Sequence, residues 1–477
     1  MKLQIIGHDD RYAVEQLQMQ LFGDELQEGG RAVSVLSRGK TWLTATAKVT
    51  YRDKTARAAK RLRVCEETVP LRRRILQQAY YLAATQVLGR TMPWGALAGV
   101  RPTKLSTKAM LSGASVREAE KMLRDTYFVS PERSRLCAAC SAHTVEALGD
   151  LRKNDLSLYI GIPFCPTRCA YCSFVSQSVE SFGNLVQPYL DALLLEVKRT
   201  GELLRESGFR VRTLYIGGGT PTTLSTLQMQ TLLGAIAQAF DLSDCLEYTV
   251  EGGRPDTLDA EKLRAIAENG VDRMSINPQT MNDEILRVIG RRHTAEEIVQ
   301  AYRDAKAAGF RTVNMDLIAG LPDDTPKSFR ASLAAVLALA PENITVHTLA
   351  RKKGADLFFQ GEKLPSAQDV AAMLDDTMRL LPEHGYEPYY LYRQKYMAGS
   401  FENVGWCKKG HSGRYNIYMM EEAHSILALG CGGMNKVNLA ENDLERFHNP
   451  KYPQEYIRRI DDVLEKKREV FALLKSK

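Results

Sequence analysis

The sequence predicts an α/β protein built around a partial (β/α)6 TIM-like barrel, with an N-terminal α+β domain and a C-terminal cap. From about residue 156 to 350, short β-rich runs alternate with helical segments, a rhythm typical of a parallel sheet with right-handed crossovers. The region before residue 150 contains both strand-like period-two patterns and helical patterns. The region after residue 350 also contains both strand and helix candidates. At 477 residues the chain is too long for one ordinary domain. We therefore expect segments 1–150, 151–350 and 351–477.

The N-terminal segment reads as a small α+β module followed by a helical connector. Its strand candidates, which include one strictly alternating run, are Leu3–Ile6, Ala32–Leu36 and Trp42–Tyr51. Its helix candidates are Ala13–Leu21, Leu71–Leu88, Val116–Tyr127 and Cys137–Leu148.

The central segment supplies the barrel. Its strand candidates are Leu158–Ile162, Thr213–Ile216, Glu247–Val250, Arg273–Ile276, Thr312–Leu317 and Ile344–His347. The helix candidates between them are Pro188–Arg205, Leu227–Phe240, Ala260–Asn269, Asp283–Val288, Ala295–Ala308 and Pro326–Leu339. In barrels of this kind the active site lies at the carboxyl ends of the strands, where the motifs below fall.

The C-terminal segment is less regular. Ala371–Leu381 has a helical pattern, Tyr386–Leu391 resembles a strand, and Glu422–Leu429 leads into a glycine-rich turn. The tail, Pro453–Leu474, has the pattern of one charged amphipathic helix.

The composition is that of a cytoplasmic globular protein. Apolar residues make up 44% and charged residues 25%, and no window is apolar enough for a membrane span. The beginning of the sequence has no signal-peptide pattern, and nine cysteines, an odd number, argue against a disulfide framework. The net charge of +7 is mild and the cationic runs are short, so we expect no nucleic-acid partner.

Three cysteines form the strongest motif. Cys165, Cys169 and Cys172 have the spacing C-x3-C-x2-C directly after a predicted strand. Three thiolates can hold a four-iron cluster and leave one iron open to a small molecule. Zinc is a rival, but structural zinc sites close with four ligands, and the next cysteine is Cys245. Three structural thiols are the remaining alternative, which the loop-like Pro166–Arg168 disfavours.

The context of these cysteines, from Tyr159 to Phe174, resembles the oxygen-independent coproporphyrinogen III oxidase family of radical S-adenosylmethionine (SAM) enzymes. The resemblance implies a [4Fe–4S] cluster and SAM as cofactors. It places Tyr171 near the adenine and Tyr159 beside the SAM site. The sequence departs from the family at Gly161, where the Tyr-x-His-x-Pro pattern has histidine.

The same resemblance assigns further SAM-binding residues in order along the chain. Glycines allow close backbone approach to a ligand, although a glycine triplet alone is also typical of a plain tight turn. By resemblance, the methionine amino group is received by Gly218, Gly219 and Thr220, and the other SAM-binding positions are Glu251, Gln279, Arg291 and Asp316.

The outer parts of the chain resemble the HemZ-type branch of the family. This resemblance rests on the motifs Pro93-Trp94, Arg101–Lys104, Tyr389–Lys395, Phe401–Trp406 and Tyr415–Gly430. The haem-chaperone branch has a His-Asn-x-x-Tyr-Trp element in this region, whereas this chain has Glu402–Trp406 without the histidine.

The resemblance implies oxidative decarboxylation of the propionates of coproporphyrinogen III to vinyl groups, with a reducing electron donor as partner. It assigns no catalytic residue beyond the cofactor site. Arg351, Arg393 and Lys395 are candidate cations for the substrate carboxylates, and His347 is either a substrate contact or a structural residue. Two alternatives remain: a radical SAM enzyme acting on another tetrapyrrole or an unrelated substrate, and a haem or cluster carrier without turnover. Cys137 and Cys140 could form a redox pair, although ordinary helix cysteines explain them as well.

Overall fold

The computed structural model describes residues 1–23, 29–172, 176–350, 363–394, 401–440 and 443–476. The chain divides into two compact units. The first comprises Met1–Ala142 and a short segment around Arg393, and the second comprises His143–Leu391 and Glu402–Lys477. Among the described residues, no helix is both long and apolar enough to cross a membrane.

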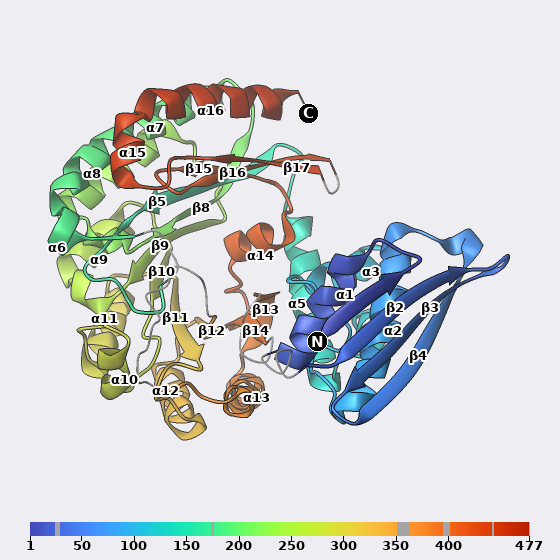
Figure 1. Cartoon of the computed structure of the whole chain (residues 1–477). Helices are drawn as coiled ribbons and strands as arrows, with labels where there is room; N and C mark the ends of the chain where they lie inside the picture. Colours follow the sequence, from blue (N-terminus) through green and yellow to red (C-terminus); the bar gives the residue numbers. More distant parts are fainter. Residues whose placement is uncertain (24–28, 173–175, 351–362, 395–400, 441–442, 477) are drawn as a thin grey trace. The chain divides into compact units, whose positions relative to one another are not determined.

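The N-terminal unit is a four-stranded sheet with helices on one face (Figure 1). Its elements are β1 (Lys2–Ile6), α1 (Arg11–Phe22), β2 (Arg31–Arg38), β3 (Trp42–Tyr51), β4 (Lys54–Arg63) and α2 (Val69–Leu88). The strand order is β1-β2-β3-β4, with β1 parallel to β2 and the other pairs antiparallel. One sheet face and the two helices share a core that includes Leu17, Ala45, Ala47 and Tyr80. Helices α3 (Thr103–Leu111), α4 (Val116–Tyr127) and α5 (Pro131–Gly149) follow.

Strand β4 is the one element of this sheet that the sequence pattern did not predict. The run Lys54–Arg63 contains mostly alanine, lysine and arginine, which favour helices. In the fold it pairs residue by residue with β3 from Tyr51↔Lys54 to Trp42↔Arg63. The hairpin partner therefore overrides the local propensity.

The second unit is built on the predicted barrel sheet. All six expected strands are present: β5 (Asp155–Ile162), β8 (Arg210–Gly218), β9 (Glu247–Gly253), β10 (Arg273–Ile276), β11 (Thr312–Ala319) and β12 (Asn343–Thr348). They lie in the order β5-β8-β9-β10-β11-β12, and each neighbouring pair is parallel. The helices that connect them are α7 (Val186–Arg205), α8 (Thr226–Ala239), α9 (Ala260–Glu268), α10 (Asp283–Val288), α11 (Ala295–Ala307) and α12 (Pro326–Leu339). Figure 1 shows these helices along the outer side of the curved sheet. The predicted partial (β/α)6 barrel is confirmed.

The C-terminal segment extends both edges of this sheet, which the sequence pattern did not predict. At one edge β15 (Ser425–Leu429) runs parallel to β5 and leads to β16 (Met434–Ala440) and β17 (Asp443–His448). At the other edge β14 (Glu402–Cys407) is antiparallel to β12, and β13 (Glu387–Arg393) lies beyond it. Helix α13 (Ala367–Glu383) precedes β13, and α14 (Arg414–Glu421) lies between β14 and β15 along the chain.

The tail forms two helices, α15 (Pro453–Arg458) and α16 (Ile460–Lys475), where one was expected. They meet at Arg459, whose ψ of 27° departs from helical geometry. A buried ion pair attaches the tail to α7, because Lys467 Nζ lies 3.1 Å from Glu196 Oε1 and both side chains are buried. The Tyr456 hydroxyl also donates to the Glu196 carboxylate. Removing either Lys467 or Glu196 would leave the other charge buried without its partner.

Candidate functional site

The cysteine motif lies on the loop that follows β5. Cys165 ends the two-residue strand β6 (Phe164–Cys165) and is 8% exposed, whereas Cys169 and Cys172 are half-buried. Thr220 Oγ1 donates a hydrogen bond of 3.5 Å to Cys165 Sγ, and Cys172 N donates to Cys169 O. Burial raises the pKa of the Cys165 thiol. A thiolate at this position therefore needs a bound cation to stabilise it.

Arg254, which directly follows β9, holds the cysteine loop in place from two strands along the sheet. Arg254 is 2% exposed and forms a two-pronged ion pair with Asp256, with contacts of 3.0 and 2.8 Å. Its third nitrogen donates to Thr167 O at 3.1 Å and to Thr167 Oγ1 at 2.7 Å. A second anchor is the hydrogen bond from Ala170 N to Ile289 O. The guanidinium thus fixes the middle of the segment that carries the three thiols.

Replacing Arg254 with leucine is expected to lower the free energy of unfolding by about 3 kcal/mol, since Asp256 and Thr167 lose their buried partner. The same change should lower the iron retained per chain, because the cysteine loop loses its fixed geometry. Urea unfolding and iron analysis measure the two effects. Arg264→Leu is the matched control, since exposed Arg264 in α9 bonds only its own helix, at Ala260 O. Equal iron retention in both variants would contradict this role.

The glycine turn after β8 packs directly against the strand that enters the cysteine loop. Gly219 N donates to Ile162 O at 2.8 Å, and Thr220 N donates to Phe164 O at 2.7 Å. A β-carbon at position 219 would lie 2.5 Å from Phe164 O, so only glycine fits there. Gly218 has a φ of 114°, which also favours glycine. The turn and the cysteine loop therefore form one rigid corner.

Glu251, on β9, presents a half-buried carboxylate beside this corner. It accepts a hydrogen bond from the Tyr215 hydroxyl, and Gly218 N donates to its Oε2 at 3.2 Å. Burial raises the pKa of Glu251 to about 7, the Tyr215 and Gly218 hydrogen bonds oppose that rise, and the nearby Asp316 charge adds to it. A cationic ligand placed here would convert the acid into a stable carboxylate.

Asp316 and Gln279 lie together two strands further along the sheet. Gln279 N donates to Asp316 O at 2.8 Å, and the Gln279 backbone has a φ of 68°. The Asp316 carboxylate accepts from Asn314 Nδ2 at 2.7 Å and lies 3.6 Å from His347 Nε2. Burial alone would raise the pKa of Asp316, but the His347 contact and the Asn314 bond more than offset it and lower that pKa. His347 therefore contacts the Asp316 carboxylate, another candidate site residue.

Arg291 and Tyr171 meet on the other side of the cysteine loop. Arg291 is 6% exposed and donates to Asn277 O at 2.5 Å and to the Tyr171 hydroxyl at 3.2 Å. Its third nitrogen, Nε, is buried and has no hydrogen-bond partner among the residues that the structure describes. A buried donor without a partner is costly, so a ligand that accepts from it would be stabilised.

Tyr159 completes the site from β5. Its ring stacks on Tyr215 at 6.4 Å with an interplanar angle of 16°, and Tyr215 in turn stacks on Tyr415 of α14 at 4.6 Å. The Tyr159 hydroxyl would lie 3.4 Å from a β-carbon at Gly218, so it faces the glycine turn.

The donor set fits a cubane cluster. Within the described part of the chain, no three His, Cys, Asp or Glu side chains gather as they would around a single metal ion. In a cubane each thiolate binds a different iron, so its three cysteines surround the cluster. One loop carries all three thiols here, and it is braced by Arg254 and the glycine turn.

Comparison with known proteins supports this assignment. The sequence model of the Radical SAM superfamily matches residues 159–336. The oxygen-independent coproporphyrinogen-III oxidase-like protein HemZ of Bacillus subtilis is 40% identical over 385 residues, which cover 80% of this chain and 77% of that protein. This chain belongs to the oxygen-independent coproporphyrinogen III oxidase-like family, HemZ-type branch, of radical SAM proteins. The cofactors of this family are a [4Fe–4S] cluster and SAM.

Other relatives of this radical SAM protein differ in their named roles. The heme chaperone HemW of Haemophilus influenzae is 30% identical over 64% of this chain and 76% of its own length. The oxygen-independent coproporphyrinogen III oxidase of Escherichia coli is 31% identical over 51% of this chain and 53% of its own. The crystal structure of the E. coli coproporphyrinogen III oxidase HemN matches with a TM-score of 0.55 and 25% identity, covering 67% of this chain and 72% of that one.

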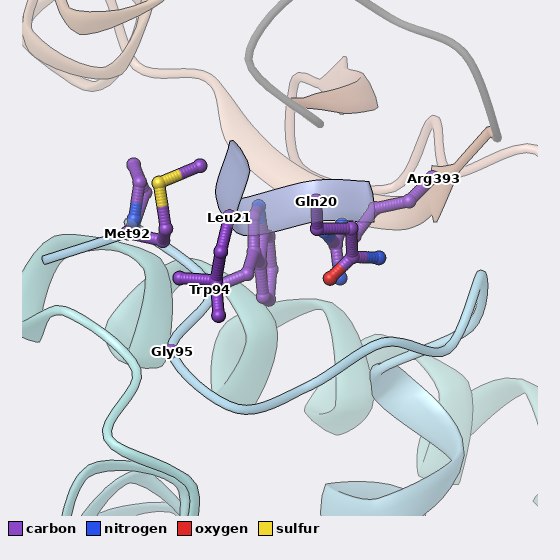
Figure 2. Close-up of a pocket in the computed structure, with 7 residues that line it drawn as sticks. Gln20, Leu21, Met92, Trp94, Gly95 and Arg393 are labelled. Atoms are coloured by element: carbon purple, nitrogen blue, oxygen red, sulfur yellow. The ribbon is translucent and has the colours of Figure 1, made fainter. Parts of the chain in front are cut away.

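The site includes residues that sequence reasoning missed and excludes one that it proposed. Arg254 and Tyr215 were missed, although Arg254 follows a parallel strand as the other site residues do. Arg393 does not belong to the site: it donates to Leu97 O at 2.6 Å in the N-terminal unit and lies 5.3 Å from the Trp94 ring. Figure 2 shows it beside Trp94 and Gln20. The other two cation candidates, Arg351 and Lys395, lie outside the described residues.

Gly161 lies at the position where the family has histidine. In this structure the turn that follows β15 occupies the space beside the Gly161 α-carbon. The turn after β15 lies against it, so a β-carbon at position 161 would be 3.2 Å from Cys431 O. The Tyr189 hydroxyl donates to Gly161 O at 2.6 Å and accepts from Cys431 N at 3.0 Å. The Gly161 backbone is thus bonded to the C-terminal segment through Tyr189.

Substituting histidine at Gly161 is expected to destabilise the fold by about 2–3 kcal/mol, because overpacking displaces the Cys431 turn. Thermal and urea unfolding measure the loss. Gly234→His is the control, since no atom lies within 4 Å of a β-carbon at that half-buried helix position. A Gly161→His protein as stable as the control would show that the turn yields freely.

Proposed function

We propose that this protein catalyses oxidative decarboxylation of propionate side chains on coproporphyrinogen III, giving vinyl groups in haem biosynthesis. The observation that carries the proposal is the convergence of the cofactor residues. The cysteine loop, the glycine turn and Gln279 follow neighbouring parallel strands, and Glu251 and Asp316 lie in the carboxyl-terminal halves of two of these strands. The named roles of the coproporphyrinogen III oxidases among its relatives supply the substrate class.

Each described side chain has a chemical task in this proposal. Cys165, Cys169 and Cys172 hold the cluster, and Glu251 accepts the methionine ammonium of SAM together with the turn at Gly218–Thr220. Arg291 Nε would donate to the SAM carboxylate, Asp316 would accept from the ribose hydroxyls, and Tyr171 would pack near the adenine. Tyr159 and Gln279 complete the SAM site. When bound, the reduced cluster and SAM together supply a 5′-deoxyadenosyl radical that removes one hydrogen atom from a substrate.

The substrate chemistry is then fixed by electron balance. The propionate β-carbon, next to the pyrrole ring, gives up a hydrogen atom. The carbon–carbon bond to the carboxylate breaks, carbon dioxide leaves, and one electron passes to a one-electron acceptor as the vinyl double bond forms. The chain's part is to hold the propionate against the radical source and keep water out.

The second candidate, a haem carrier like the chaperone relatives, is disfavoured by Glu402. This residue takes the place of the histidine in the chaperone His-Asn-x-x-Tyr-Trp element, and it lies on β14 with 1% exposure. The next residue, Asn403, accepts a hydrogen bond from Thr348 N in the neighbouring strand. A buried glutamate in a paired strand offers no imidazole for haem iron.

Anaerobic reconstitution with iron, sulfide, SAM, a reductant and coproporphyrinogen III tests the proposal. Protoporphyrinogen formation together with 5′-deoxyadenosine is the expected result. Deoxyadenosine without protoporphyrinogen would indicate a radical SAM enzyme with another substrate. Tight haem binding without SAM cleavage would indicate a carrier, and either of these outcomes would overturn the decarboxylase assignment.

A further inference from the structure

Among the described residues of the N-terminal unit, helices pack on only one face of the four-stranded sheet. Helices α1 and α2 pack on that face, where Ala45, Ala47 and Val49 of β3 are buried. The alternate residues of β3 therefore point to the uncovered side, and strand pairing extends that side across the sheet. Figure 1 shows β2, β3 and β4 of this sheet in blue.

This face gathers cations from all four strands. The exposed members are Lys2 of β1, Arg31 of β2, Lys48 of β3, and Arg57, Arg61 and Arg63 of β4. In the described chain, none of these six forms an ion pair with a carboxylate, and no Asp or Glu occurs among the four strands' residues. The acids that flank the strands in sequence are Asp9 after β1, Asp53 in the β3–β4 turn, and Glu66 and Glu67 after β4, where Glu67 pairs with Arg38 at the end of β2. The charged residues of this face are therefore all positive.

Two of these cations are placed at a cost to the fold. Lys48 and Arg57 pair directly across β3 and β4, where like charges repel. Cations on an edge strand can serve to prevent aggregation, and Arg57, Arg61 and Arg63 lie on such a strand. Lys48 and Arg31 lie on the interior strands β3 and β2, so edge protection does not account for them. Charge complementarity to a polyanionic partner would account for cations on these interior strands.

The neutral residues of this face indicate which class of polyanion it would bind. Trp42 is 42% exposed, with the Arg63 guanidinium 5.7 Å from its ring. Thr44, Thr46, Thr50 and Thr55 supply hydroxyls along the same side. Single-stranded nucleic acids bind open sheets in this way: bases stack on an exposed aromatic ring while phosphates meet lysine and arginine.

We propose that the uncovered face of the β1–β4 sheet binds single-stranded nucleic acid. Phosphates contact Lys48, Arg57 and Arg61, and a base stacks on Trp42. The chain contains three tryptophans, and the other two, Trp94 and Trp406, are each 2% exposed. Quenching of the intrinsic fluorescence is therefore a direct report from this face.

The test titrates the full-length, cluster-loaded protein with a 20-nucleotide oligo(U) RNA and, in parallel, oligo(dT). Lys48→Gln/Arg57→Gln/Arg61→Gln should weaken binding on the order of 100-fold at 0.1 M salt and flatten the log–log salt slope by about 2. Arg117→Gln/Lys121→Gln/Arg124→Gln on α4 removes the same charge from the same unit and should bind as the parent does. Trp42→Phe should abolish the fluorescence quench.

Preference for either the RNA or the DNA strand supports the proposal. Equal losses in the two triple variants would overturn it, because binding would then depend only on net charge. A quench that survives Trp42→Phe, tighter binding to a 20-base-pair duplex, or tighter binding to phosphatidylserine vesicles would also overturn it. The sheet variant should unfold at no lower temperature than the parent, since the Lys48–Arg57 repulsion is removed, so a folding defect cannot imitate the loss.

Discussion

Cys169→Ala is expected to abolish both the iron–sulfur cluster and reductive SAM cleavage. A cubane held by two thiolates exposes a second iron and loses the geometry that the loop between Cys165 and Cys172 imposes. Because the cofactors carry the chemistry, 5′-deoxyadenosine formation should fall by at least about 1,000-fold. Iron and sulfide analysis, the EPR signal of the reduced cluster, and chromatography of the products measure the three effects.

Cys407→Ala provides the matched control. Cys407 is a buried thiol on β14, and burial raises its pKa to about 12, so it remains a neutral thiol. The control should keep its cluster and its SAM cleavage even if packing costs some stability. A Cys169→Ala protein that kept the cluster and cleaved SAM would refute the assignment of the site.

Glu251→Gln should separate folding stability from SAM binding, because one carboxyl serves both. The pKa of Glu251 is about 7 in the fold, raised chiefly by burial, against an ordinary value of 4.5. An acid whose folded pKa is raised contributes stability below pH 4.5, and that contribution is lost as the pH rises through 7. The total is about 3 kcal/mol. Glutamine cannot ionise, so the variant should be more stable than the parent at pH 8.

SAM binding should move in the opposite direction. The SAM ammonium requires the ionised form of Glu251, so the affinity of the parent should rise with pH up to about 7 and then level off. The glutamine variant should bind about 10–100-fold more weakly at pH 8, with no such pH dependence, because it lacks the charge-assisted hydrogen bond. The SAM-induced change in the EPR signal of the reduced cluster reports binding without turnover.

Glu247→Gln is the control for this pair of effects. Glu247 lies on the same strand and accepts hydrogen bonds from Tyr415 N and Thr249 Oγ1, with no contact to the glycine turn. Its SAM affinity should keep the pH dependence of the parent. If Glu251→Gln were both less stable at pH 8 and normal in SAM affinity, the carboxyl would have a different role.

The barrel was predictable from sequence because its signals are local. The six β-rich runs and the helical segments between them each have their own periodicity. The six runs are strands of the sheet, and the helical segments are the helices that connect them. The cysteine spacing and the glycine triplet are also local and follow adjacent strands, so their packing against each other could be expected without coordinates. The assignment of Glu251, Gln279 and Asp316 to SAM binding came from the family resemblance and not from local patterns.

What sequence did not reveal depends on contacts between distant residues. Strand β4 has the composition of a helix and forms only because β3 pairs with it. Strand β15 joins the barrel beside β5 through pairing across more than half of the chain. Arg254 bonds Thr167, a partner far back in the sequence, so nothing in its own surroundings marked it as a support for the cysteine loop.

The basic face shows the same limitation for charge. Lys48 is an isolated cation in β3, and the five cations in the ten residues Lys54–Arg63 alternate between the two faces of β4. The sheet brings Lys48, Arg57 and Arg61 to one side. The expectation that no nucleic acid binds was based on runs, and it did not consider a surface assembled by strand pairing.

The most direct measurement of the proposed reaction follows a single atom. Coproporphyrinogen III carrying deuterium at the propionate β-carbons would be incubated anaerobically with the reconstituted protein, SAM and a reductant, and the 5′-deoxyadenosine examined by mass spectrometry. The proposed chemistry predicts deuterium in the 5′-deoxyadenosine and a vinyl product lighter by the lost carbon dioxide. Unlabelled 5′-deoxyadenosine with intact substrate would contradict it.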